Sequence, residues 1–147
     1  MKSVFDQTTR EELITRVQML DENSTARWGK MNIYQMLHHC VLCEELYLGK
    51  RKHKRAFMGR IFGKLGLKNI LDEKKSFPQN APTSNLFKVK ETTGNVEAEK
   101  RKWISLLDEY KTYPDSYVHW FFGKMSKDQV GRFVYKHSDH HLRQFGA

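Results

Sequence analysis

Cysteines and long apolar runs are both scarce in this sequence. Its 147 residues include two cysteines, Cys40 and Cys43, which lie in one apolar stretch. A disulfide between residues three apart fits poorly inside a helix, so we expect reduced thiols and a cytoplasmic location. No stretch approaches the roughly 20 apolar residues that span a bilayer, and the first residues lack the apolar core of a secretion signal. We therefore expect a soluble, unprocessed protein.

Proline is also rare, and its positions divide the chain. Two of the three prolines, Pro78 and Pro82, fall between residues 49 and 95, where the turn-rich string FPQNAPTSN occurs. Hydrophobic residues make up 39% of the chain, which is too much for a disordered protein, and 147 residues suit one domain. We expect a single domain, residues 1–147, with a turn-rich crossover over residues 49–95.

Four stretches have the periodicity of long amphipathic helices. Thr8 or Thr9 can cap the first helix and Ser126 the last, while Gly49 and Gly146 are suited to end the second and the last. The four stretches cover residues 6–20, 31–48, 95–113 and 126–145. No convincing strand and no internal repeat is visible. The pattern predicts an all-α fold, a four-helix bundle with a long crossover between the second and third long helices.

The crossover is strongly basic. Between Lys50 and Lys75 there are ten Lys or Arg residues and two acidic ones, a local net charge of +8, compared with +9 for the whole chain. Within this segment, residues 55–71 have the pattern of a short amphipathic helix. Its apolar residues either form part of a site for nucleic acid or anionic lipid, or cap the bundle while the lysines stay in water. These apolar residues are Phe57, Met58, Ile61, Phe62 and Leu65.

Histidines gather in the second and last predicted helices. His137 and His141 are four residues apart, so both imidazoles point to the same side of the last helix, one turn apart. On the second helix, His39 lies inside the apolar stripe, whereas the neighbouring His38 shares its face with polar residues. His140 lies beside the stripe that contains the pair, and we do not expect it to be a ligand.

Three imidazoles from two helices, those of His39, His137 and His141, are a donor set for a metal ion. They would leave coordination positions open for water or substrate, as in a catalytic site rather than a closed structural one. Imidazole binds zinc, nickel, copper and iron alike, so the ligand type does not identify the ion. The alternative is that these histidines are solvated or satisfied within the core, because HxxxH also occurs by chance.

Other residues near the histidines have weaker assignments. His119, in the aromatic string HWFFG, is either a proton carrier near the metal or a capped imidazole. The two cysteines form a single CxxC motif and are expected to pack in the core. Arg143 and Gln144 follow the last histidine and can hydrogen-bond ligand rings, whereas Asp139 points away from them. No catalytic base and no cofactor-binding residue is assigned.

Four strings carry a resemblance to a known family. They are WGKMNIYQMLHHC, FPQNAPT, HWFFGKMSKDQVGRFVYKH and KHSDHHLRQFG, of which the last is the most specific. Over almost the whole chain they resemble the DinB/YfiT-like metalloenzyme superfamily, as a branch with a domain of unknown function. The resemblance implies a four-helix bundle in which three histidines hold a divalent metal. Mapped by motif, these are His39, directly before cysteine in MLHHC, and the pair His137 and His141.

Relatives in that superfamily include thiol S-transferases that use low-molecular-weight thiols and a thiol-dependent maleylpyruvate isomerase. The resemblance therefore implies a metal-dependent enzyme for a small-molecule substrate, in which a divalent metal (zinc, nickel, iron or manganese) activates such a thiol or water. Likeness of fold does not by itself define a reaction. The alternative is a non-catalytic helical protein whose basic crossover binds nucleic acid or anionic membrane, and a homodimer is left open.

Overall fold

Helices make up most of the computed structural model, which describes residues 1–113 and 116–147. A 3-10 turn, η1 (Glu109–Thr112), extends the fourth helix, and two short strands, β1 (Ser116–His119) and β2 (Gly123–Ser126), precede the fifth. The five α-helices are α1 (Gln7–Gln18), α2 (Ile33–Tyr47), α3 (Phe57–Ile70), α4 (Val96–Asp108) and α5 (Lys127–Gln144). The prediction of a mostly helical protein is therefore confirmed.

The helices that carry the histidines begin at capping boxes. The hydroxyl of Ser126 accepts the backbone N–H of Gln129 at 3.2 Å, and the Gln129 side chain accepts the backbone N–H of Ser126 at 3.0 Å. Asn32 and Gln35 form the same reciprocal pair before α2. Both starts were predicted from the sequence, and both are confirmed.

The other helix ends are mixed in their agreement with the sequence. Gly49 and Gly146 follow α2 and α5 with φ of +73° and +82°, as expected of glycines that end helices. The prediction that Thr8 or Thr9 caps α1 is wrong, because Asp6 is the N-cap and both threonines lie inside the helix. Thr9 is buried, so its side chain faces the protein interior instead of the exposed start of the helix.

A β-hairpin replaces the irregular aromatic connection expected before the last helix. β1 and β2 pair antiparallel, from Ser116 opposite Ser126 to His119 opposite Gly123. Gly123 has a φ of +83°, which glycine adopts without strain, at the end of a three-residue turn. The expectation that the chain contains no strand is wrong. The two strands escaped prediction because each has only four residues, too few to show a clear alternation of polar and apolar residues.

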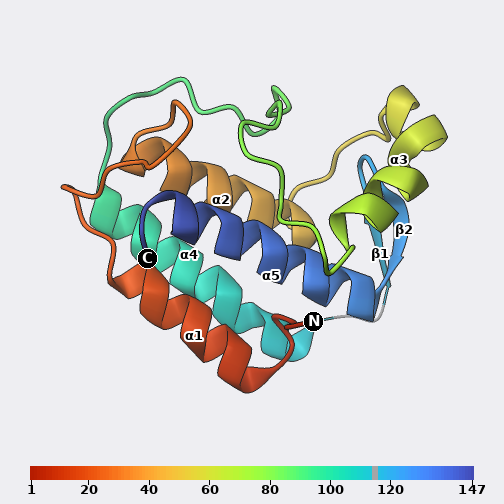
Figure 1. Ribbon diagram of the computed structural model, residues 1–147, viewed down its shortest axis with the longest axis horizontal. Coiled ribbons are helices and arrows are strands. Elements are labelled where there is room, and N and C mark those ends of the chain that lie inside the picture. Colours follow the sequence, from red (N-terminus) through yellow and green to blue (C-terminus); the bar gives the residue numbers. More distant parts are fainter. Residues whose placement is uncertain (114–115) are drawn as a thin grey trace.

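Four of the helices lie side by side (Figure 1). α1 and α2 each pack against both α4 and α5, and the core fills the space between them. α3 lies apart from these four, at one end of the molecule, where it contacts β2. The largest completely enclosed core side chains include Trp103, Leu13, Leu37 and Leu107. Within the described ranges, no helix is both long and apolar enough to cross a membrane.

The crossover of residues 49–95 contains the short helix that the sequence predicted, which is α3. Its inward face is unexpected: Gly59, Gly63 and Leu67 are the buried residues. The expectation that the bulky apolar residues of this helix cap the bundle is wrong, because their side chains are exposed. They are Phe57, Met58, Ile61, Phe62 and Leu65.

Candidate metal centre

Three buried histidines meet where α2 faces α5. His39 comes from α2, and His137 and His141 come from successive turns of α5. The ring centroids are 5.5 Å apart for His39 and His137, 4.9 Å for His39 and His141, and 4.7 Å for His137 and His141. The structure therefore brings together all three histidines that the sequence singled out. Their role as ligands is a separate matter and stays a prediction.

The orientation of His39 is set by a loop of the crossover. Its Nδ1 lies 3.0 Å from the backbone oxygen of Phe87, and the Phe87 ring packs edge-on against the imidazole. Because a carbonyl oxygen only accepts hydrogen bonds, Nδ1 carries the hydrogen and Nε2 keeps its lone pair. That Nε2 lies 3.7 Å from the sulfur of Cys43, one turn further along α2. His39 therefore directs the lone pair of its Nε2 toward Cys43 and the other histidines.

His141 is oriented in the same way by a side chain. Its Nδ1 lies 2.9 Å from Oε1 of Gln144, whose Nε2 donates to the backbone oxygen of Trp28 at 2.8 Å. The second bond fixes which end of the amide is the oxygen, so Nδ1 of His141 donates and its Nε2 keeps a lone pair. Gly29 leaves room for this amide, since an added Cβ would lie 2.6 Å from its nitrogen. The prediction that Gln144 bonds to a histidine of the set is confirmed.

His137 has a polar atom without a partner. Its Nδ1 is buried and makes no hydrogen bond with any described residue. A buried nitrogen left unsatisfied costs about 1–3 kcal/mol, so a structure that keeps one calls for an explanation. Coordination of a metal ion by the imidazole groups of this cluster is one such explanation, since ligand nitrogens are deprotonated lone-pair donors.

All three imidazoles are held neutral. Burial lowers the pKa of His39, although its bond to the Phe87 carbonyl opposes this. Burial lowers the pKa of His137 and His141 well below the usual histidine range, and the neighbouring imidazoles lower both further. Neutral imidazole is the form that binds metal ions. The site is therefore electrostatically suited to an ion and unsuited to extra protons.

Cys43 belongs to the same group of donors. One donor atom from each of His39, Cys43 and His137 lies within 4.8 Å of the others, close enough to hold one metal ion, and His141 is not part of this set. The thiol is free and buried, and burial raises its pKa far above the usual cysteine range. The prediction that the two cysteines pack in the core is confirmed, because Cys40 and Cys43 are both buried. Cys43 also follows His39 by four positions on α2, and this spacing could have identified it as a neighbour of the histidines.

The remaining histidines of these helices lie outside the donor group. His140 is buried between Trp28 and Phe77, with ring centroids 5.7 and 5.1 Å away. His38 is partly exposed on the other side of α2, where its Nδ1 lies 3.1 Å from a carboxylate oxygen of Glu99. The structure thus confirms that His39 lies on the buried side of α2 and His38 does not. The choice of ligand itself stays a prediction.

His119 is a capped imidazole. Its Nδ1 accepts the backbone N–H groups of Phe121 and Phe122, both at 3.1 Å, and so holds the turn of the hairpin. Burial, with a smaller effect of nearby Arg55, lowers the pKa of His119 to about 3. The reading of His119 as a proton carrier has no support in these contacts, because its accepting nitrogen is already occupied.

Asp139 and Arg143 pair with each other and not with the histidine rings. The Asp139 carboxylate lies 2.9 Å from a guanidinium nitrogen of Arg16 and 3.1 Å from Nε of Arg143. Asp139 therefore points away from the donor group, as predicted. Arg143, which was predicted as a hydrogen-bond partner of a ligand, is engaged in this surface network instead.

A buried carboxyl group lies beside the donors on α2. Glu44 accepts the hydroxyl of Tyr110 at 2.6 Å, and the hydroxyl of Ser138 lies 3.4 Å away. Burial raises the pKa of Glu44 to about 7, although these hydrogen bonds oppose the shift. The group joins α2 to η1 and α5 next to the histidines. Glu44 was not predicted, because its position four residues after Cys40 on the apolar stripe is its only signal in the sequence.

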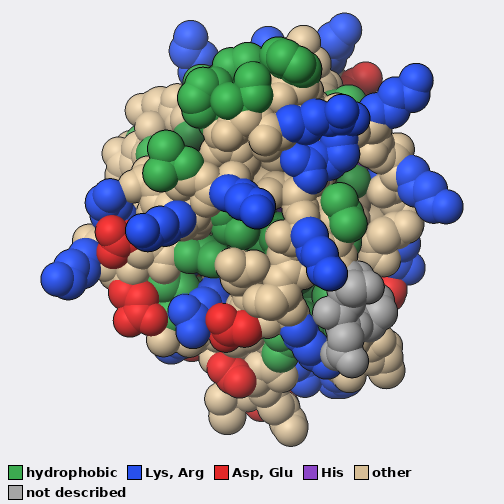
Figure 2. Space-filling model, turned by 90° about the vertical axis from the view of Figure 1, so that its right-hand side faces the viewer, with side chains coloured by type: hydrophobic (Ala, Val, Ile, Leu, Met, Phe, Trp, Pro, Cys, Tyr) green, Lys and Arg blue, Asp and Glu red, His purple; other side chains and the backbone are tan. Residues whose placement is uncertain are grey.

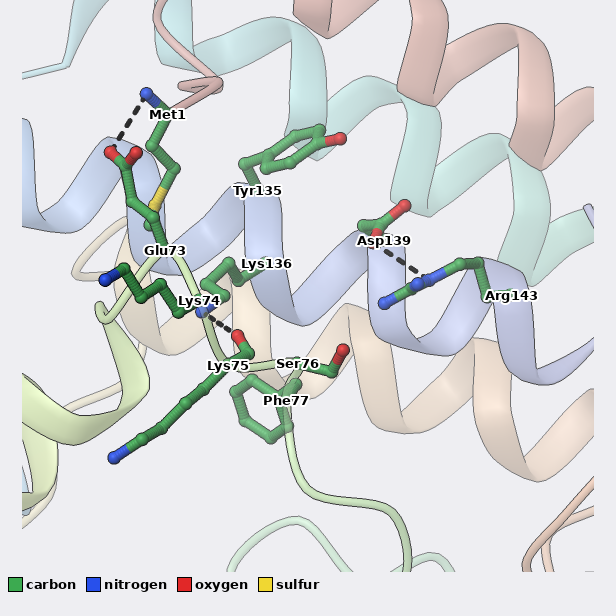
Figure 3. Close-up of a pocket in the computed structure, with 10 residues that line it drawn as sticks. All are labelled: Met1, Glu73, Lys74, Lys75, Ser76, Phe77, Tyr135, Lys136, Asp139 and Arg143. Carbon is green, nitrogen blue, oxygen red and sulfur yellow. Dashed lines mark hydrogen bonds and ion pairs between the residues drawn. The ribbon is translucent and has the colours of Figure 1, made fainter.

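A cavity of about 320 Å³ lies against α5 near the histidines. Figure 3 shows it between the chain segment of residues 73–77 and one face of α5. Phe77 forms part of its wall and also contacts the rings of His137 and His140, with centroid distances of 5.7 and 5.1 Å. The three predicted ligands do not line this cavity. Phe77 therefore separates the cavity from the donor group.

Fold and site together define a mostly helical protein with a buried group of histidine and cysteine donors that could hold a metal ion. The model of one protein family, described as "Protein of unknown function (DUF1569)", matches residues 2–147, and the chain belongs to this family. No curated protein and no solved structure matches the chain. The expectation of a domain of unknown function is confirmed, whereas membership of the DinB/YfiT-like superfamily stays a prediction.

Proposed function

We propose that residues 1–147 form one DinB-like four-helix bundle domain, with α1, α2, α4 and α5 as the four helices. Two features support this assignment. These helices pack against one another with a long crossover between α2 and α4. The histidines also have the distribution that the superfamily resemblance implies, with His39 on the second long helix and the pair His137 and His141 on the last.

We further propose that His39, His137 and His141 hold a divalent transition metal. The observation that carries this proposal is that two of the three imidazoles already use Nδ1 for a hydrogen bond, which leaves Nε2 available to a metal. Two of the rings donate Nδ1–H to a backbone carbonyl and to a glutamine oxygen, which is the arrangement that orients histidine ligands in metal sites. The sulfur of Cys43, 3.7 Å from Nε2 of His39, offers a further donor.

The function we propose is that of a metal-dependent enzyme, a thiol S-transferase or a related one. A bound divalent metal supplies Lewis acidity, which lowers the pKa of a thiol or water. The chain's own residues keep the imidazoles neutral and oriented, and Phe77 and Phe87 exclude water from them. A low-molecular-weight thiol gives up its proton, and its sulfur forms a bond to an electrophilic carbon of a small-molecule substrate, while the bond from that carbon to its leaving group breaks and the leaving group departs with the electron pair and takes up a proton.

We propose that small molecules approach the donor group through the cavity shown in Figure 3. Its walls include Lys74, Lys75 and Arg143, so it favours anionic groups such as the carboxylates of a small thiol. Phe77 stands between this cavity and His137. Entry therefore requires the Phe77 ring to turn aside. The free thiols of Cys40 and Cys43 fit a reducing compartment such as the cytoplasm.

Metal content tests the ligand assignment. Tag-free protein, purified without chelators or nickel resin, should contain close to one equivalent of a transition metal. We expect His137→Ala and His141→Ala to lose it and His38→Ala, a control outside the donor group, to keep it. Cys43→Ala separates two donor sets: retained metal supports three histidines, whereas loss of metal with retention in His141→Ala supports His39, Cys43 and His137.

Circular dichroism on each variant separates loss of a ligand from loss of the fold. Unchanged metal content in folded His137→Ala would sink both donor sets, because His137 belongs to each. A wild-type protein that takes up none of zinc, nickel, iron and manganese after incubation would refute the metal proposal. If metal binds, turnover of small electrophiles with a low-molecular-weight thiol tests the enzyme, and activity equal in the wild type and metal-free variants would contradict it.

A further inference from the structure

One face of α3 exposes a row of large apolar side chains. All five are more than half exposed, although residues of this kind are usually buried. They follow one another at helical spacing, so they form a continuous strip along the outside of the helix. The exposed fractions are 74% for Phe57, 54% for Met58, 58% for Ile61, 51% for Phe62 and 68% for Leu65.

The opposite face of α3 explains why these side chains point outward. Gly59 and Gly63 are buried against the hairpin turn, where an added Cβ would lie 2.4 and 2.3 Å from the backbone oxygen of Phe121. Such distances leave no room for any side chain, so only the glycine face can pack there. The helix cannot be rotated to bury its bulky residues, and the apolar strip is held on the surface.

Basic side chains run along one edge of this strip. Arg60, Lys64 and Lys68 are spaced four residues apart on α3, are exposed, and make no ion pair or hydrogen bond with another described side chain. Lys64 and Lys68 border a cavity of about 820 Å³ between α3, β2 and the start of α5, which combines apolar walls with charged ones. The cationic side chains that line it are Lys64, Lys68, Lys75, Lys124 and Arg132, and they outnumber its two acidic ones, Asp72 and Asp128, which pair with Lys75 and Arg132.

Figure 2 shows this side of the molecule. Hydrophobic side chains gather at the top of the face, and Lys and Arg side chains surround them and extend below. The acidic side chains visible on this face lie mainly lower down, away from the apolar cluster. A surface that combines exposed apolar bulk with unpaired positive charge matches an anionic lipid interface, where headgroups attract the cations and the acyl boundary takes up the apolar groups.

We propose that α3 binds the surface of an anionic lipid bilayer, lying in the plane of the interface with its apolar strip inserted. Anionic headgroups contact Arg60, Lys64 and Lys68 and enter the cationic cavity. A second copy of the chain fits this face poorly, because a symmetric contact would bring two segments of charge +8 together. Nucleic acid would use the lysines but has no place for a strip of phenylalanine, isoleucine and leucine.

Vesicle co-sedimentation tests the proposal directly. The full-length protein is mixed with phosphatidylcholine vesicles that either contain or lack phosphatidylglycerol, at about 0.1 M and about 0.5 M salt. We expect binding only to the anionic vesicles and weaker binding at high salt. Two variants divide the contributions: Phe57→Ser/Ile61→Ser should bind about tenfold more weakly, and Lys64→Glu/Lys68→Glu about 30-fold more weakly.

Matched controls use exposed residues elsewhere on the chain. Met19→Ser removes an apolar side chain that is 69% exposed on another surface, after α1. Lys30→Glu reverses an exposed charge before α2. Both should bind anionic vesicles like the wild type. Because every substituted residue is exposed, the variants should fold, and circular dichroism checks this.

Three outcomes would overturn the proposal. The first is no sedimentation with anionic vesicles, or equal sedimentation with both kinds. The second is binding of duplex DNA that Phe57→Ser/Ile61→Ser leaves unchanged, together with no vesicle binding, which would assign the basic edge to nucleic acid. The third is a dimer that the same variant dissociates, again without vesicle binding, which would assign the apolar strip to a second copy. None of these readouts depends on bound metal.

Discussion

Acidification should destabilise the metal-free protein, because its buried histidines resist protonation. The pKa of His119, His137 and His141 is lowered far below the value of about 6.5 that an unfolded chain has. The unfolded state therefore binds more protons as the pH falls, and stability is lost below about pH 6.5. At about pH 5.5 each such histidine costs somewhat more than about 1 kcal/mol, so the three cost about 4 kcal/mol together, and His39 and His140, whose pKa is also lowered, add to this loss.

Glu44 works in the opposite direction. Its pKa is raised to about 7 in the folded protein, whereas an unfolded glutamate titrates near 4.5. Between these two values the folded state binds the extra proton, so its contribution to stability is complete at low pH and is lost as the pH rises. Going from about pH 7.5 to about pH 5.5, Glu44 returns about 2 kcal/mol. The net expected loss in the free energy of unfolding is therefore at least about 2 kcal/mol.

Urea unfolding of chelator-treated protein at about pH 7.5 and about pH 5.5, followed by circular dichroism, measures this difference. The variant Glu44→Gln removes the opposing group while it keeps an acceptor for the Tyr110 hydroxyl. Its loss on acidification should exceed that of the wild type by about 2 kcal/mol. Wild-type stability that is flat or rises toward pH 5.5 would falsify the view that these histidines are buried in the neutral form. An equal loss in Glu44→Gln and wild type would show that Glu44 does not titrate in this range.

Two further predictions follow from close contacts. Gly63→Ala should destabilise the protein by about 1–3 kcal/mol in urea unfolding, because its Cβ would overlap the Phe121 backbone. Gly66→Ala, whose nearest contact would be an ordinary 3.5 Å, should cost nothing, and equal effects of the two would contradict the packing of α3. Phe77→Ala should release bound metal to a chelating dye faster than wild type, while Phe62→Ala on the exposed strip should not; identical rates would exclude Phe77 as a barrier.

The fold could be predicted where neighbouring residues alone determine the structure. It could not be predicted where the structure depends on how two distant segments pack together. Ser126 begins α5 because its own side chain caps the helix, so its role could be read from the sequence. The amphipathic pattern of residues 55–71 was also visible, but which face is buried depends on the hairpin turn. Gly59 and Gly63 are buried because the backbone of Phe121 lies against them. Because the hairpin was not predicted, the bulky apolar residues of α3 were expected to pack against the bundle, whereas the glycines do so.

The same distinction applies to the donor group. His137 and His141 were predictable as a pair because four residues span one helical turn, and His39 because it lies on an apolar stripe. Their partners were not, because the Phe87 and Trp28 carbonyls come from loops whose positions no local spacing specifies. Cys43 had the spacing but was read as a small hydrophobic residue. A buried thiol can be a small apolar core residue or a metal donor, and only the short distance between the Cys43 sulfur and His39 points to the second role.

Lys136 lies between α3 and the histidine group. Its ammonium group donates to three backbone carbonyls between residues 70 and 75, at 2.6 to 2.8 Å, so all three of its hydrogens are used. These carbonyls lie between the end of α3 and Phe77, and Lys136 directly precedes His137 on α5. Lys136 thus binds the end of α3, and the segment that leads from it to Phe77, to α5. A displacement of α3 should therefore reach, through Lys136, the turn of α5 that carries His137, which would couple the proposed lipid-binding helix to the proposed metal site.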